Sequence, residues 1–366
     1  MVEEKILKRT SIFLTLVSVL VCGTIFRFPR LKAFSELWME AMEEYNLKVT
    51  VEEMNMTGLE LLEYNNEKAQ EQDEEEIISF DSQLRLELPL GVPGNELQIT
   101  QDYVTQTIDI KIPYADAEYF YQYPMLGKSD NIDSLTYESM EGYGIVEIVT
   151  SQVFELKTSY DKDYYYIDFL TPQEVYDKVV VIDAGHGGNA PGATKQGVNE
   201  KDIDLDIVLK LKEIFDAVDD GSIGVYYTRT EDENPSFENR VGLANKSNAN
   251  LFISIHNNST QSGRMSNING TQVMYDELKE EEDPGSKGLA QICLEEVTAQ
   301  TGSSNKGIVE GNDIYIIRSS NMPVALIEVG FMTNQTELNN LRSEEYQEKV
   351  AQGIYNAIMR AFEEGY

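Results

Sequence analysis

The chain has 366 residues, of which 41% are hydrophobic, and a formal net charge of -35 at pH 7. This length suits two domains and a tail, and the apolar content is sufficient to build their cores. A surface this acidic repels a phosphate backbone, which excludes nucleic acid as a partner.

Residues 1–32 predict a signal anchor or a signal peptide. Lys5, Lys8 and Arg9 precede residues 11–26, an uncharged run of 16 residues. A membrane span needs about 17–25 residues, so the run is slightly short, but its basic front suits an export signal. A buried core helix is the less favoured alternative. We therefore expect an extracytoplasmic protein that contacts the membrane through this segment or is secreted.

Residues 33–76 predict a helical region that ends in an acidic linker. Residues 33–65 have amphipathic helical spacing, whereas residues 66–76 contain almost no apolar side chains.

Residues 77–172 predict a small all-β sandwich domain. Apolar and polar residues alternate along several short segments, a pattern typical of half-buried strands. These segments are residues 82–90, 105–112, 143–149, 152–157 and 164–170. Regularly spaced strands with turns between them are typical of a sandwich.

Residues 177–366 predict an α/β domain with a mostly parallel sheet flanked by helices. Strand-like runs occur at residues 178–184, 223–228, 251–255, 271–275 and 324–329. Helical patterns fall between them, near residues 200–218, 237–247, 285–301 and 344–363. Such alternation is characteristic of βαβ units.

The chain has only two histidines, and each follows an apolar strand-like run. His186 lies between glycines after residues 179–183, and His256 follows residues 251–255. Neutral imidazole is a common metal ligand, and open α/β folds hold their reactive groups at strand ends. Taken alone, the glycine-rich segment around His186 could equally form an anion-binding loop or a tight turn.

Glu200 is expected on the first turn of a helix, near the same end of the sheet as His186. Alone it would be interpreted as a carboxylate that complements the helix dipole, worth about 0.3–1 kcal/mol. Together with the two histidines it completes a recognised ligand set for catalytic zinc. Such a site keeps a water molecule in the fourth position and lowers its pKa to about 7.

Glu328 interrupts the apolar run of residues 324–331, where burying an unpaired carboxylate is costly. If its strand ends there, the carboxylate points at the metal site and can accept a proton from water. The alternative is a structural ion pair with a residue such as Arg240.

Seven segments in this order resemble the zinc-dependent N-acetylmuramoyl-L-alanine amidases, in their amidase type 3 catalytic domain. The segments are residues 182–188, 199–201, 227–230, 240–245, 252–258, 323–331 and 346–361. The resemblance covers residues 178–366. It implies one Zn²⁺ per chain with His186, Glu200 and His256 as ligands, and Glu328 as the catalytic residue. It also implies a peptidoglycan hydrolase that cleaves the amide between N-acetylmuramic acid and the L-alanine of the stem peptide.

Other matching residues have supporting roles in this interpretation. Arg229, Arg240 and Asn245 are expected to be mainly structural. Asn257 and Asn258 are expected to line the substrate groove.

The resemblance leaves the regulation of the protein open. Residues 276–285 form only a short acidic loop, too short for a helix that plugs the metal site. Residues 77–172 loosely resemble an AMIN-type domain, which localises some amidases to the cell wall. The sequence does not identify a regulatory protein partner. The alternative function is a catalytically silent cell-wall-binding or regulatory protein on an amidase fold.

Overall fold

The computed structural model describes residues 57–71, 82–113, 123, 125–140, 142–218, 220–279 and 284–366. The chain divides into two compact units, Met1–Leu61 and Leu62–Tyr366. Only residues 57–61 of the first unit are described, so the predicted apolar segment at residues 1–32 lies outside the described residues. Among the described helices, none is both long and apolar enough to cross a membrane.

Helix α3 (Gly58–Glu71) extends into the segment predicted as a linker. Residues 66–71 are helical because Glu, Lys, Ala and Gln are all good helix formers, and the role of this region as a linker stays a prediction. Asn66 also fixes the helix, because its amide donates to the Gly127 carbonyl at 2.7 Å and accepts from the Gly127 N–H at 3.1 Å. Residues 72–76 of the predicted linker lie outside the described residues.

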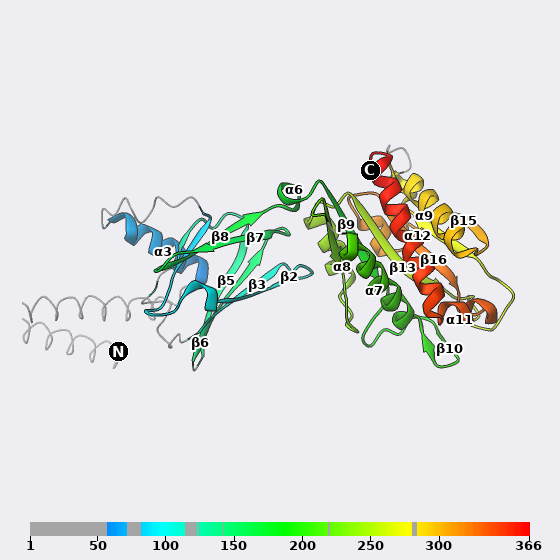
Figure 1. Ribbon diagram of the computed structural model, residues 1–366, viewed down its shortest axis with the longest axis horizontal. Coiled ribbons are helices and arrows are strands. Elements are labelled where there is room, and N and C mark those ends of the chain that lie inside the picture. The colour runs from blue at the N-terminus through cyan, green and yellow to red at the C-terminus, as the bar shows by residue number, and fades with distance from the viewer. Residues whose placement is uncertain are drawn as a thin grey trace, which may run out of the picture. The chain divides into compact units, whose positions relative to one another are not determined.

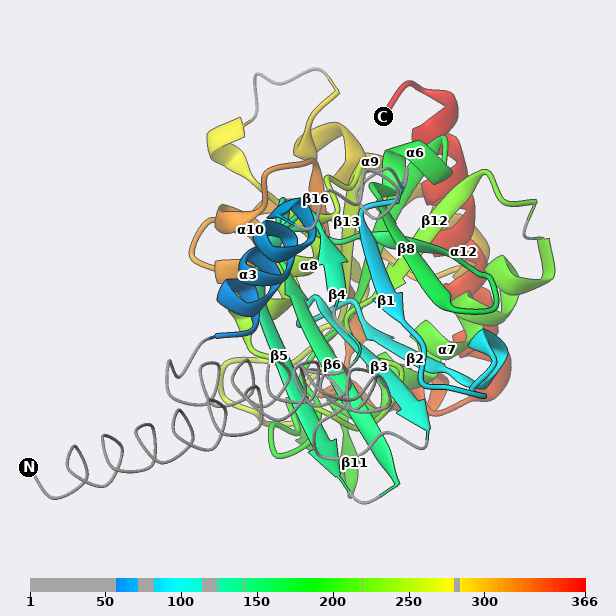
Figure 2. The ribbon, with the colours of Figure 1, turned by 90° about the vertical axis from the view of Figure 1, so that its left-hand side faces the viewer.

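Residues 84–170 contain two four-stranded antiparallel sheets. The first has the order β4-β1-β8-β7, with strands β1 (Leu84–Glu87), β4 (Met125–Gly127), β7 (Glu155–Tyr160) and β8 (Tyr164–Leu170). The second has the order β2-β3-β6-β5, with strands β2 (Gln98–Asp102), β3 (Thr107–Pro113), β5 (Ile132–Met140) and β6 (Tyr143–Thr150) (Figure 2). Burial alternates along β3, β6 and β8 with the expected period of two. The strands are present, and the packing of a sandwich domain stays a prediction.

A six-stranded mixed sheet forms the centre of the second half of the chain, in the order β12-β9-β13-β16-β14-β15 (Figure 1). Its strands are β9 (Lys178–Ala184), β12 (Ile223–Tyr227), β13 (Leu251–Asn258), β14 (Thr271–Tyr275), β15 (Asn305–Glu310) and β16 (Val324–Phe331). The first four in this order run parallel, as predicted, but β14 pairs antiparallel with β16. The connection from β13 to β14 contains no crossover helix, which a parallel neighbour would need.

Helices cover both faces of this sheet, as the sequence predicts. The helices α7 (Glu200–Val218), α9 (Ser286–Thr301) and α12 (Glu344–Glu363) share one core with alternate residues of the strands, such as Ile253 and Ile327. The helices α8 (Phe237–Lys246) and α10 (Tyr315–Ser319) pack against the strand residues that point to the opposite face, such as Phe252 and Leu326. Because side chains alternate along a strand, His256 and Glu328 lie on the face of the sheet that α8 covers.

The sequence analysis missed several short elements. They are β15, α10, the helices α6 (Pro172–Val175) and α11 (Gln335–Leu341), and a hairpin made of β10 (Thr194–Lys195) and β11 (Val198–Asn199). Each is too short to show a clear apolar period. The strands β2, β4 and β5 were also not among the predicted segments, although β5 has nine residues.

Candidate metal centre

The parallel strands bring the two histidines to one edge of the sheet. His186 follows the end of β9, and its ring centroid lies 4.9 Å from that of His256. His256 is not at a strand end, because β13 continues to Asn258. The pairing of β13 with β16 becomes irregular between His256 and Asn258, directly after the second histidine.

Glycines allow the side chains of this site to approach one another. His186 and Gly187 both have positive φ, at 56° and 128°, which turns the chain sharply after β9. A Cβ on Gly185 would overlap the His256 imidazole, and one on Gly192 would lie 2.5 Å from a Glu200 carboxylate oxygen. Only glycine therefore fits at these two positions without displacing a side chain of the site.

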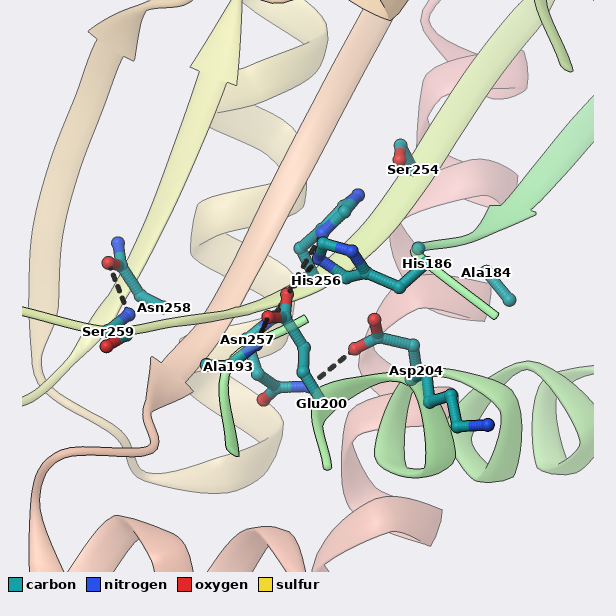
Figure 3. A network of polar contacts seen from close by, with 12 residues as sticks. Ala184, His186, Ala193, Glu200, Asp204, Ser254, His256, Asn257, Asn258 and Ser259 are labelled. Atoms are coloured by element: carbon teal, nitrogen blue, oxygen red, sulfur yellow. Dashed lines mark hydrogen bonds and ion pairs between the residues drawn. The ribbon is translucent and has the colours of Figure 1, made fainter. Parts of the chain in front are cut away.

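Glu200 connects the two histidines. Its Oε1 lies 3.1 Å from His186 Nε2 and 3.0 Å from His256 Nδ1 (Figure 3). The Asn257 N–H donates to the same oxygen at 3.1 Å, and the Ala193 N–H donates to Oε2 at 2.7 Å. Burial opposes ionisation of Glu200, but hydrogen bonds from His186 and His256 hold its pKa below the usual value. Glu200 is therefore a fixed carboxylate.

The two distances from Glu200 Oε1 to the imidazoles fit one small divalent cation. Tetrahedral zinc with bonds of about 2.0–2.1 Å places its ligand atoms about 3.3 Å apart, close to the separations of Glu200 Oε1 from the two imidazoles. Two imidazoles and one carboxylate leave a fourth position open for water or substrate.

The charges around His256 also favour a cation. Burial lowers the pKa of His256, but the hydrogen bond to Glu200 and the charges of Asp204, Glu200 and Glu328 raise it to about 9. A pocket that stabilises an imidazolium proton stabilises a metal ion in its place.

Asp204 is a further carboxylate of this site, and the sequence analysis missed it. Four donor atoms lie within 4.8 Å of one another, one from each of His186, Glu200, Asp204 and His256. Asp204 Oδ1 accepts from Asn257 Nδ2 at 2.8 Å, whereas the buried Oδ2 has no partner among the described groups. Burial and the charge of Glu200 raise the pKa of Asp204 well above its usual value. Its spacing of four from Glu200, on one helix face, could have identified it.

Glu328 lines the same pocket as the histidines. It pairs with His256 in the register of β13 and β16, and β16 continues to Phe331, so the expectation that the strand ends at Glu328 is wrong. Within the described part of the chain, its Oε2 is buried without a hydrogen-bond partner. Burial raises the pKa of Glu328 to about 7, with His256 opposing the shift and Glu200 adding to it.

Arg240 pairs with Asp183, which the sequence analysis did not single out, and not with Glu328. Arg240 Nη1 lies 2.6 Å from Asp183 Oδ1, and both side chains are buried. Arg240 Nη2 donates to the His186 carbonyl at 2.6 Å, so the ion pair also anchors the loop that carries the first histidine. Glu328 is left without this proposed structural partner.

Arg229 and Asn245 make the structural contacts expected of them. Arg229 is buried and donates to the carbonyls of Ala184, Gly185 and Lys201, which ties the end of β9 to the first turn of α7. Asn245 donates to the Ser319 carbonyl and so joins α8 to α10.

The pocket around these residues is lined by two kinds of side chain. Near α8 and α10, and on β16, the apolar lining residues are Pro235, Phe237, Ile314, Ile316 and Leu326. Small and polar lining residues come from the segments after β9 and at the end of β13, namely Ala190, Gly192, Ala193, Asn258 and Ser259. Asn257 and Asn258 also line this pocket, and the expectation that they line the substrate groove stays a prediction.

Comparison with known proteins gives matches to the second half of the chain. The family model described as N-acetylmuramoyl-L-alanine amidase matches residues 180–360. A germination-specific N-acetylmuramoyl-L-alanine amidase of Bacillus subtilis is 30% identical over 202 residues, which cover 51% of this chain and 81% of the relative. The N-acetylmuramoyl-L-alanine amidase LytC of the same species is 33% identical, over 50% of this chain but only 36% of the relative.

Solved structures also match about half of the chain. The catalytic domain of the N-acetylmuramoyl-L-alanine amidase CwlV from Bacillus (Paenibacillus) polymyxa var. colistinus is 35% identical, with a TM-score of 0.46. The match covers 51% of this chain and 98% of that structure.

Proposed function

This chain belongs to the N-acetylmuramoyl-L-alanine amidase family, and we propose that it hydrolyses peptidoglycan at the amide between N-acetylmuramic acid and the L-alanine of the stem peptide. The observation that carries this proposal is the convergence of His186, Glu200, His256 and Glu328 on one pocket. A structural site would have no need of an unpaired carboxylate oxygen such as Glu328 Oε2.

The proposed cofactor is one Zn²⁺ per chain, with His186 Nε2, His256 Nδ1 and Glu200 Oε1 as its ligands. When bound, zinc acts as a Lewis acid and lowers the pKa of water to about 7. The separations of 3.0 and 3.1 Å between these ligand atoms support the assignment. Asp204 accepts a hydrogen bond from the Asn257 side chain, and this bond steadies the backbone N–H of Asn257 that donates to Glu200.

Glu328 is the proposed proton carrier. Its free Oε2 accepts a proton from the attacking water and passes that proton to the nitrogen of the leaving L-alanine as the amide C–N bond breaks. The products are a lactyl carboxylate on the sugar and a peptide with a free amino terminus. A pKa near 7 supports this role, because such a group both accepts and donates protons at neutral pH.

The test is mass spectrometry of purified peptidoglycan digested by the full chain, with and without a chelator. We expect peptides with an L-alanine amino terminus, which disappear on chelation and return with added zinc. Intact linkages from a folded, zinc-loaded protein would replace this proposal with the silent wall-binding alternative.

The matched variant is Glu328→Gln, which keeps the size of the side chain and removes its proton-accepting oxygen. We expect turnover to fall about 10²–10⁴-fold while one zinc per chain is retained. Loss of zinc from this variant would instead make Glu328 a ligand.

The remaining regions have proposed roles in localisation. Because peptidoglycan lies outside the cytoplasm, we propose extracytoplasmic action, with residues 1–32 directing export or anchoring the chain to the membrane. We also propose that residues 77–172 bind the wall in the manner of an AMIN-type domain, which their antiparallel strands support. Cosedimentation with purified walls, for the chain with and without residues 77–172, tests this role. Equal sedimentation would contradict it.

A further inference from the structure

We infer that Lys195 and Arg264 form a carboxylate-binding subsite at the rim of the metal pocket, which takes the anionic stem peptide of the substrate. The identity of the substrate rests on the proposed function. The position and the charge of the two cations do not.

Two loops bring these cations to one rim of the pocket. Lys195 lies in the β10–β11 hairpin, two residues after Ala193, and Arg264 lies in the loop after β13. The Lys195 ammonium is 3.5 Å from the position of a Cβ on Gly263, so the hairpin and the loop meet beside Arg264. Thr260 Oγ1 donates to the Arg264 carbonyl at 3.0 Å, which closes this loop directly after Ser259.

The rim is part of the pocket that holds the metal-binding group. Ala193 and Ser259 both line that pocket, and the Ala193 N–H donates to Glu200. Figure 3 shows Ser259 on the side of the histidine cluster opposite Ala184. Lys195 follows Ala193 by two residues and Arg264 lies in the loop that begins at Ser259, so a substrate that extends from the cluster past Ala193 and Ser259 reaches these two cations.

Both charges are available to a ligand. Within the part of the chain that the structure describes, neither Lys195 nor Arg264 has an ion-pair partner, and the Arg264 side chain is exposed. Other lysines of this half do pair, for example Lys201 with Asp232 at 2.6 Å. The chain has 64 Asp and Glu residues, so acidic partners are abundant. A lack of acidic groups therefore does not explain why these two neighbouring cations are unpaired.

The described residues that line the rest of the pocket offer no unpaired Lys or Arg to an anion. Arg240 lines it but is paired with Asp183, and the other charged side chains there include Glu200, Glu238 and Glu328. A carboxylate-bearing ligand therefore gains most by directing its charge toward Lys195 and Arg264. The first residue of α8, Phe237, also lines the pocket and is apolar and 59% exposed, so it offers a surface to the uncharged sugar. We therefore infer that the substrate binds with its sugar at α8 and its peptide at the β10–β11 hairpin.

The experiment measures equilibrium binding by calorimetry, so that it does not depend on turnover. The protein is the full zinc-loaded chain carrying Glu328→Gln. The probes are N-acetylmuramoyl-L-alanyl-D-glutamic acid and its diamide, which differ only in the two carboxylates. We expect tighter binding of the acid, and a preference that decreases with added salt.

Charge-removing variants assign this preference to residues. Lys195→Ala and Arg264→Ala should each weaken binding of the acid about two- to fivefold and leave binding of the diamide unchanged. The matched control is Arg342→Ala, because Arg342 is also exposed and unpaired within the described residues but lies at the far end of α11. Equal weakening for both probes, or no weakening beyond that of the control, would overturn the inference.

Failure of the proposed function gives a different result. A chain that prefers the acid but cleaves no muropeptide retains the subsite and loses the amidase assignment. A chain that cleaves peptidoglycan but binds both probes equally retains the amidase assignment and loses the subsite.

Discussion

The buried ion pair between Asp183 and Arg240 offers the sharpest test of how the fold supports the site. The Asp183 carboxylate is fully buried and accepts from Arg240 Nη1 at 2.6 Å, Thr228 Oγ1 at 2.7 Å and Ser254 Oγ at 2.6 Å. Asp183→Asn keeps the size of the side chain but leaves the Arg240 guanidinium buried without its anion.

The expected loss is large compared with the stability of a domain. Removing one partner of a buried ion pair costs about 3–5 kcal/mol, because the other charge stays uncompensated. The free energy of unfolding of a whole domain is about 5–15 kcal/mol. At about 2–4 °C per kcal/mol for a domain of this size, Tm should fall by about 6–20 °C.

The assays are urea unfolding of the full chain, which gives the free energy of unfolding, and thermal unfolding, which gives Tm, both followed by circular dichroism. The matched control is Asp216→Asn, which breaks the exposed pair of Lys212 and Asp216 at 2.6 Å and should change stability by about 0.5 kcal/mol or less. A double variant with Asp183→Asn and Arg240→Met leaves no unpaired charge, so it should cost less than the sum of the single changes. A loss below about 1 kcal/mol for Asp183→Asn, or strict additivity in the double variant, would refute this reasoning.

Three further outcomes follow from the same geometry. Gly185→Ala places a Cβ in the His256 ring and should lower zinc affinity about 10–100-fold in a competition titration. The control Gly242→Ala has open space around the added Cβ and should leave that affinity unchanged. Equal effects of the two changes would contradict the steric argument. Glu200→Ala should reduce the bound zinc, measured by atomic absorption, to well below one per chain, and undiminished zinc would return Glu200 to the role of a helix-end carboxylate. Burial opposes ionisation of Asp183, but Arg240 and the hydrogen bonds from Ser254 and Thr228 lower its pKa in the folded state. The stability that Asp183 contributes is therefore present above the unfolded pKa of about 3.9 and is lost as the pH falls through the folded pKa. An Asp183→Asn chain whose stability falls as steeply as that of the parent chain below pH 4 would contradict this.

The sequence by itself determined the α/β architecture of the second half and three of the four donor residues of the candidate metal centre, all but Asp204. Apolar runs of strand length alternate with helical periods, and parallel strands in such folds end at one edge of the sheet. With only two histidines in the chain, each close to such an end, His186 and His256 had to lie near each other. Glu200 followed from its place at the start of a helix at the same edge.

Only the tertiary structure decided the contacts between residues that are far apart in the chain. The choice of Asp183 as the partner of Arg240, the extension of β13 and β16 beyond His256 and Glu328, and the position of Lys195 beside Gly263 all depend on such contacts. Strand ends are set by hydrogen bonds to neighbouring strands, and buried charges are paired by packing across the core. Neither has a period that a single sequence can show.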